Sequence, residues 1–209
     1  MIRSKKTSEM VKMALFIALI ILLSVTPLGY IPLGAVNATT IQMPVIIGAV
    51  LFGWKKGAVL GGVFGLTSLI KNTLQPNATS FVFSPFIPVF GEESGSLWAI
   101  VICLLPRIMI GVTAAAVFAG LSKIKVNKSF AAAAAGFCGS LINTVLVMGG
   151  IYLFFGESYS AAKDIAYKTL MAAVSATITG AGITEAVVSA VVCGAVCAAL
   201  FKYLKRNGN

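Results

Sequence analysis

Long apolar runs separated by short polar connections recur along the whole chain, and this pattern limits the fold more than any other feature. A hydrocarbon core about 30 Å thick needs about 20 residues of apolar helix to cross it. With 58% hydrophobic and only 11% charged residues, the chain is too apolar for a soluble domain. We therefore predict a single integral membrane domain, 1–209, with helical runs at 10–27, 39–54, 57–71, 97–121, 130–155 and 180–203.

The second and third runs are short for full spans, and a re-entrant hairpin would accommodate both. Their near-complete apolarity and the GWKKG link between them favour two true spans, completed by flanking residues or by local thinning of the bilayer. The N-terminal MIRSKK before an apolar stretch also has the order of a signal peptide. Because comparable runs follow it, we interpret the first run as a retained anchor and the fold class as an all-α bundle of six transmembrane helices.

The cationic residues gather on alternate connections between the runs. Because cytoplasmic loops carry the excess of Lys and Arg, we predict these connections and both termini in the cytoplasm, with 28–38, 72–96 and 156–179 outside. The net charge of +10 is explained by this topology, so no nucleic-acid partner is expected and a phosphate-binding tail is the weaker alternative. The cations concerned are Arg3, Lys5, Lys6, Lys12, Lys55, Lys56, Lys123, Lys125, Lys128, Lys202, Lys205 and Arg206.

The sequence contains no His, which removes the commonest metal ligand and general base. Its cysteines lie inside apolar runs without CxxC spacing, so we interpret them as buried small hydrophobes. We therefore expect no catalytic residue, no metal site and no cofactor, in a protein that is not an enzyme. The cysteines are Cys103, Cys138, Cys193 and Cys197.

Arg107 lies about ten residues into the fourth run, which places it about 15 Å below the outer surface, near the midplane. A lipid-facing charge at that depth costs about 2.5 to 3.5 kcal/mol or more, so Arg107 must face the interior of the bundle. Pro106 beside it leaves the carbonyl of Cys103, or of its neighbour, without a helical hydrogen bond and predicts a kink.

Glu185 is the one carboxylate inside any run, about 10 Å below the outer surface in the same half as Arg107. The two could form a structural ion pair or line a polar cavity open to the outside; these interpretations are compatible, and we favour the second. Asn143, Lys71 and Asn72 add hydrogen-bonding groups in this half. Together these residues predict a cavity for a small polar ligand.

The outer segment 72–96 combines prolines with several phenylalanines, and apolar rings in water need a surface to cover. This composition predicts an ordered extracellular loop, which we interpret as a lid over the polar cavity; packing on the bundle alone would explain it equally. The segment 156–179 is too polar at its start to span, but it carries apolar residues at helical spacing, which indicates an interfacial helix or lid.

Small residues recur at every fourth position in two runs, as Ala14 and Ala18 and as Gly57, Gly61 and Gly65. Such stripes allow close backbone approach between helices in lipid. On spacing alone, packing within one bundle is favoured over the docking of a partner.

Several stretches resemble the substrate-binding S components of energy-coupling factor (ECF) vitamin transporters, and the resemblance covers nearly all of the chain. The segment ALFIA, 14–18, matches the AxxxA pattern on the first helix of that family. Residues 31–73 and the stretches TSFVFSP, PRIMIG, INTVLVMGGIYLFF and GITEAVVSAVV look like its pantothenate-type branch.

The resemblance implies a subunit of an ABC-type importer in a prokaryotic cell membrane. Such a subunit captures a water-soluble vitamin from outside with high affinity, then topples when docked to a transmembrane T component driven by two cytoplasmic ATPases. The lack of a Walker A sequence here agrees with that division of labour. The resemblance assigns Ala14 and Ala18 to T-component docking, and Arg107 would meet the carboxylate of pantothenate. The substrate-binding candidates are Lys71, Asn72, Ser80, Phe81, Arg107, Asn143 and Glu185.

Three alternatives stay open. Related branches bind pyridoxine, thiamine precursors or other vitamins, and a neutral pair of Arg107 and Glu185 would suit an uncharged ligand. A stand-alone channel or secondary carrier could use the same two charges for gating or coupling, although no inverted repeat is visible. An intramembrane enzyme is disfavoured, because rhomboid-like or aspartyl chemistry needs a His or a second intramembrane carboxylate.

Overall fold

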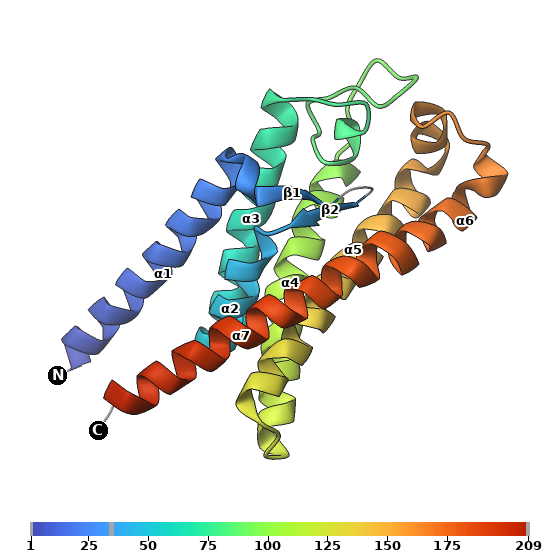
Figure 1. The fold of residues 1–209 in the computed structure, drawn as a ribbon. Coiled ribbons are helices and arrows are strands. Elements are labelled where there is room, and N and C mark those ends of the chain that lie inside the picture. The colour runs from blue at the N-terminus through green and yellow to red at the C-terminus, as the bar shows by residue number, and fades with distance from the viewer. Residues whose placement is uncertain (1, 34–35, 208–209) are drawn as a thin grey trace.

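The protein is a bundle of helices of unequal length, as the ribbon of the computed structural model shows for residues 2–33 and 36–207 (Figure 1). The helical fold class is confirmed. A π-helical segment, Ile178–Gly182, joins the last two helices into one long rod. The helices are α1 (Ile2–Val25), α2 (Gln42–Phe52), α3 (Trp54–Leu74), α4 (Trp98–Lys123), α5 (Lys128–Ala162), α6 (Tyr167–Thr177) and α7 (Ile183–Asn207).

Some sequence-based predictions lie outside the described residues. They concern the two ends of the predicted domain 1–209 and residues 34–35 of the predicted connection 28–38. They also concern the side chains of Arg3, Lys5, Lys6 and Lys205.

Four helical stretches of the described chain are long and apolar enough to cross a membrane: Thr7–Val25, Trp98–Lys123, Lys128–Ala162 and Tyr167–Tyr203. By contrast, α2 has 11 residues and rises only about 16 Å, roughly half of a hydrocarbon core. The predicted run 39–54 is therefore longer than the helix that it contains. Gly53 ends α2 with a φ of 83°, a conformation that glycine adopts without strain, and α3 begins at the next residue.

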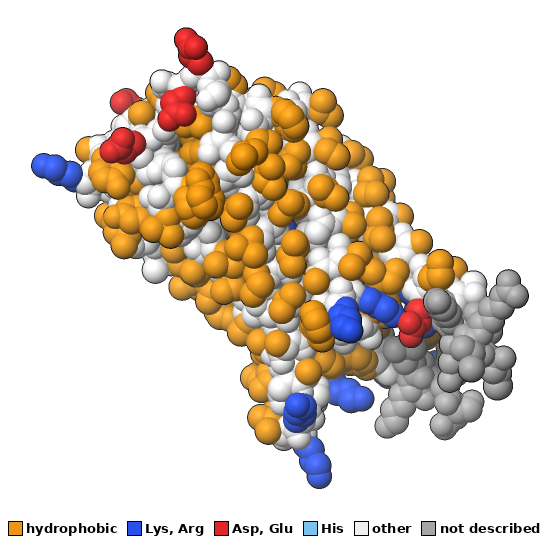
Figure 2. Space-filling model, turned by 180° about the vertical axis from the view of Figure 1, so that it is seen from behind, with side chains coloured by type: hydrophobic (Ala, Val, Ile, Leu, Met, Phe, Trp, Pro, Cys, Tyr) orange, Lys and Arg blue, Asp and Glu red, His pale blue; other side chains and the backbone are white. Residues whose placement is uncertain are grey.

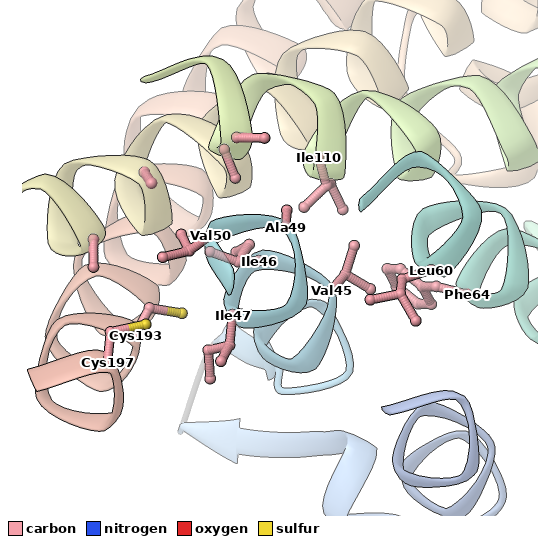
Figure 3. Close-up of a cluster of buried hydrophobic side chains, with 14 of the residues drawn as sticks. Val45, Ile46, Ile47, Ala49, Val50, Leu60, Phe64, Ile110, Cys193 and Cys197 are labelled. Atoms are coloured by element: carbon pink, nitrogen blue, oxygen red, sulfur yellow. The ribbon is translucent and has the colours of Figure 1, made fainter. Parts of the chain in front are cut away.

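α2 lies at the centre of the bundle, where it contacts α1, α3, α4, α5 and α7. It is apolar on every face, which is the pattern of a helix surrounded by protein. Figure 3 shows Val45, Ile46 and Val50 of α2 among buried side chains from its neighbours. Cys193 and Cys197 belong to this core, which confirms the interpretation of these two cysteines as buried hydrophobes.

The glycine stripe of α3 packs against the backbone of α4. A Cβ at Gly61 would overlap the carbonyl oxygen of Arg107, and a Cβ at Gly57 would lie 2.9 Å from the carbonyl oxygen of Gly111. A Cβ at Gly65 would lie 2.8 Å from a methyl carbon of Leu104. The stripe therefore packs inside the bundle, and it sets how closely α3 approaches the part of α4 that carries Arg107.

A two-stranded antiparallel hairpin, β1 (Tyr30–Leu33) and β2 (Val36–Thr39), stands where the sequence predicted only a connection. It follows α1 and crosses the bundle towards α7, and β2 contacts α7 (Figure 1). Two paired strands satisfy each other's backbone groups, which allows this segment to lie among the helices. The sequence did not indicate it because the segment has neither a clear alternation of polar and apolar residues nor a turn dipeptide.

The predicted outer segment 156–179 is largely helical. α5 continues to Ala162 across a break at Phe155, whose φ of −133° and ψ of 18° are not helical. α6 then runs back towards α7, with Leu170 and Val174 buried. The expected helix in this segment is confirmed, and its position relative to a membrane surface stays a prediction.

Charged and apolar side chains are separated on the surface. Figure 2 shows most acidic side chains at one end of the molecule, most cations towards the other, and a broad apolar belt between them. Both termini lie towards the end of the bundle that carries the α4–α5 connection (Figure 1). An apolar belt between two charged ends is the surface that a bilayer requires.

The contact of α3 with α4 can be tested with two neighbouring glycines. We expect Gly61→Ala to destabilise the purified protein by about 1–3 kcal/mol, because its new methyl group meets backbone that cannot move aside. Gly62→Ala is the matched control, since nothing lies within 4 Å of its Cβ position, and it should be neutral or slightly stabilising. Thermal denaturation in detergent measures both, and equal melting temperatures would contradict this packing.

Candidate functional site

Arg107 is half-buried in α4 and contacts both helix backbone and aromatic rings. Its Nη1 donates a hydrogen bond of 2.9 Å to the carbonyl oxygen of Ile102. That carbonyl lies four residues before Pro106, which has no N–H to donate to it. The expectation of a freed carbonyl is therefore confirmed, and Arg107 satisfies it while α4 continues as one helix. The guanidinium carbon also lies 5.0 Å from the ring centre of Phe83 and 5.8 Å from that of Phe64, within cation–π distance.

Glu185, in the first turn of α7, holds the hairpin. Its Oε1 accepts a hydrogen bond of 2.7 Å from the backbone N–H of Thr39, the last residue of β2. A hydrogen bond to a carboxylate is about twice as strong as a neutral one, so this contact fixes β2 against α7. The side chain is half-buried, as expected for an intramembrane carboxylate that faces the interior.

Arg107 and Glu185 do not form an ion pair in this structure. Among the side chains that the structure describes, the salt bridge is that of Lys56 with Glu9, at 2.6 Å. Arg107 and Glu185 still interact electrostatically, so they lie in the same region of the bundle. Each charge has its own hydrogen-bonding partner instead, at Ile102 for Arg107 and at Thr39 for Glu185.

Asn143 lies on α5 at the level of Arg107. Gly139 of α5 packs against Ile110 of α4, and the two helices run antiparallel, so one turn along α5 corresponds to one turn back along α4. The Oδ1 atom of Asn143 is buried and accepts no hydrogen bond from any described residue.

The same antiparallel arrangement places Glu185 near that level. Thr144, the residue after Asn143, packs against Gly182, which precedes Glu185 by three residues. The structure therefore places three of the predicted site residues at nearly the same level of the bundle, on three different helices: Arg107, Asn143 and Glu185.

Asn72 and Ser80 attach the loop 75–97 to the end of α3. Asn72 accepts a hydrogen bond of 3.0 Å from the hydroxyl of Ser80, which is fully buried. A second bond, of 2.7 Å, joins the hydroxyls of Thr73 and Ser84. These contacts fasten the loop to the bundle, and they give Asn72 and Ser80 a role in holding it.

The aromatic rings of the loop divide between interior and surface. Phe81 is buried and packs edge-to-face against Phe155 of α5, with ring centres 5.7 Å apart. Phe83 covers Arg107, whereas Phe86 and Phe90 are exposed. The expectation that the rings cover a surface therefore holds for Phe81 and Phe83 only.

Lys71 lies apart from this cluster. It lines a cavity of about 600 Å³ between the C-terminal ends of α1 and α3. A second cavity, of about 290 Å³, lies between α5 and α6. Neither of these two is lined by Arg107, Asn143 or Glu185.

Gln42 is a buried polar residue that sequence analysis missed. It is fully buried at the start of α2, and its Nε2 donates to the hydroxyls of Ser140 at 2.9 Å and Ser189 at 3.0 Å. These bonds join α2 to α5 and α7. The signal was present, because Gln42 is the one amide side chain in the apolar run 39–54.

Ala14 and Ala18 are exposed on α1, the least buried of the four long apolar stretches. Large apolar side chains are exposed beside them, among them Leu15 and Leu22. A small-residue stripe on an uncovered helix is available to a partner, whereas the stripe of α3 is used within the bundle.

Comparison with known proteins agrees with this architecture. Residues 8–197 match the family described as ECF transporter, substrate-specific component. The chain is 36% identical over 193 residues to the pantothenic acid transporter PanT of Lactococcus lactis subsp. cremoris, across 88% of this chain and 96% of that protein. It is 35% identical over 155 residues to the pantothenate transporter PanT of Leuconostoc mesenteroides subsp. mesenteroides, across 69% of this chain and 68% of that protein. The chain belongs to the substrate-specific components of ECF transporters, and it is therefore a multi-pass membrane subunit that binds a transported substrate and not an enzyme.

Proposed function

We propose that this subunit captures pantothenate from outside the cell and delivers it through an ECF transporter. The assignment of pantothenate as substrate rests on Arg107, a cation inside an apolar bundle, at one level with Asn143 and Glu185. A guanidinium matches a carboxylate with two parallel hydrogen bonds, and pantothenate is a carboxylate with hydroxyl and amide groups. The relatives named pantothenate transporters support the same ligand.

In this proposal both termini face the cytoplasm, and the loop 75–97 lies outside. The support is the excess of Lys and Arg on the termini and on the α2–α3 and α4–α5 connections. All six sequence runs would then cross the membrane or enter it deeply, with the short α2 completed by the hairpin before it. The polar cluster opens towards the side that carries the hairpin and the loop.

We assign the predicted site residues different tasks. Arg107 binds the carboxylate, while Asn143 and Glu185 take hydroxyl and amide groups of the ligand. Asn72, Ser80 and Phe81 act through the loop that they hold, because their polar or aromatic groups are engaged with the bundle. Lys71 faces the cavity between α1 and α3, and we assign it no ligand contact.

We also propose that a transmembrane T component docks on α1 and that two cytoplasmic ATPases supply the energy. The exposure of Ala14 and Ala18 supports this docking face. Toppling of the subunit within the membrane, driven by those partners, would then carry the ligand inward.

Two measurements test the function directly. Mass spectrometry of the small molecule that copurifies with the subunit in detergent should identify pantothenate, and equilibrium binding should give a saturable site. If a different vitamin copurifies, the assignment of pantothenate as substrate is wrong. Uptake by cells should require co-expressed T component and ATPases; uptake with this chain alone would instead establish a stand-alone carrier.

The role of Arg107 can be tested by Arg107→Gln. We expect pantothenate binding to weaken by about 10- to 100-fold, because a charge-assisted hydrogen bond inside the bundle is lost. Lys168→Gln is the matched control, since that cation is exposed on α6, and it should leave the affinity unchanged. Equal affinities of the two variants would remove Arg107 from the site.

The docking face can be tested by Ala14→Leu combined with Ala18→Leu. Two larger side chains on the stripe should reduce complex formation with the T component by about tenfold or more, while pantothenate binding stays normal. Ala119→Leu, at an exposed position of α4, is the control and should assemble normally. Pull-down with a tagged T component measures assembly, and normal recovery of the double variant would place the interface elsewhere.

A further inference from the structure

Two buried amide oxygens lie close to the proposed site without a hydrogen-bond donor. They are Oε1 of Gln42 and Oδ1 of Asn143, and neither accepts a hydrogen bond from any residue that the structure describes. Folded proteins pair the great majority of buried polar atoms, so unmet acceptors are exceptions that call for a cause. Inside an apolar bundle the penalty is larger still, because water is not at hand to replace the missing donor.

The amide of Gln42 is held in a fixed orientation. Its side chain is fully buried, and both hydrogen bonds of Nε2 go to hydroxyls, at 2.9 Å to Ser140 and 3.0 Å to Ser189. The nitrogen end is therefore anchored between α5 and α7. The oxygen end of the same rigid group is set in place as an acceptor.

Gln42 lies about one helical turn from two of the residues assigned to the site, Glu185 and Asn143. Ser189, which it contacts, is one helical turn along α7 from Glu185, and Ser140 is three residues along α5 from Asn143. Gln42 also follows Thr39 by three residues, and the N–H of Thr39 binds the carboxylate of Glu185. Gln42 therefore lies about one turn deeper in the bundle than Glu185 and Asn143.

We propose that Gln42 and Asn143 form an acceptor floor of the binding site, in which their amide oxygens accept hydrogen bonds from hydroxyl or amide N–H groups of the ligand. This inference rests on the proposed function and narrows the class of substrate. Arg107 can only donate, so it selects for an anionic group. The acceptor floor selects for donor groups elsewhere on the same molecule, and carboxylates without hydroxyl or N–H groups are excluded.

The experiment is a cycle of variants and analogues. Equilibrium binding is measured for pantothenate, for its two deoxy analogues that each lack one hydroxyl, and for the analogue with an ester in place of the amide. Each ligand is tested on the parent protein and on Gln42→Leu, which keeps the size of the side chain and removes the acceptor. Gln75→Leu, an exposed amide at the start of the outer loop, is the matched control and should behave as the parent protein.

We expect Gln42→Leu to weaken pantothenate binding by about tenfold or more. At least one analogue should bind the parent protein weakly and lose less than about threefold on Gln42→Leu, because the group that Gln42 recognises is already absent. A purely structural role would lower the affinity for every ligand by the same factor, and that outcome overturns the inference. Asn143→Leu is measured in the same cycle. It should likewise weaken pantothenate binding more than the binding of at least one analogue.

The test stays decisive if a variant does not fold. The parent protein alone must discriminate against at least one of the three analogues by about tenfold, and equal affinity for all four ligands overturns the acceptor floor. Failure of the parent protein to bind pantothenate at all is a different result. That result overturns the proposed function and the acceptor floor with it. If pantothenate binds, but Gln42→Leu weakens all ligands by the same factor, the acceptor floor alone is overturned.

Discussion

The hydrogen bond from Arg107 to the carbonyl of Ile102 makes a buried cation compatible with this bundle. Pro106 deprives that carbonyl of its helical donor, and the guanidinium one residue later replaces the donor. The rings of Phe64 and Phe83 also lie within cation–π distance of the charge. Because a guanidinium carries five donors, the same group can serve the helix and an anionic ligand together. The proline and the arginine are therefore one structural unit.

The glycines of α3 set how closely α3 packs against the part of α4 that contains Pro106 and Arg107. Gly61 packs directly against the carbonyl of Arg107, and Gly57 meets Gly111 one turn further along α4. Beside this contact, α2 lies at the centre of the bundle, where five helices surround its 11 residues. The start of α2, with the fully buried Gln42, lies inside the bundle, and the hairpin leads the chain to it.

The sequence predicted best what depends on the high cost of charge in lipid. Arg107 had to face the interior, and its burial required no knowledge of neighbours. The partner of Glu185 could not be predicted, because the N–H of Thr39 is a backbone group and no sequence pattern reveals it. The hairpin was missed for the same reason, since tertiary contacts with α7 hold it in place of turn chemistry. Gln42 was overlooked because a single amide near the start of an apolar run is also typical of a helix boundary.

The loop 75–97 and the hairpin are attached to the bundle in different ways. The loop 75–97 is held by hydroxyl and amide contacts to the end of α3, away from the charges except where Phe83 covers Arg107. Glu185 itself holds the hairpin, because its carboxylate accepts a hydrogen bond from the backbone N–H of Thr39. A ligand group that donates to the same oxygen would compete with Thr39. The hairpin follows α1 with only a short turn between them, so a few residues of chain connect the strands that Glu185 holds to the helix that carries Ala14 and Ala18.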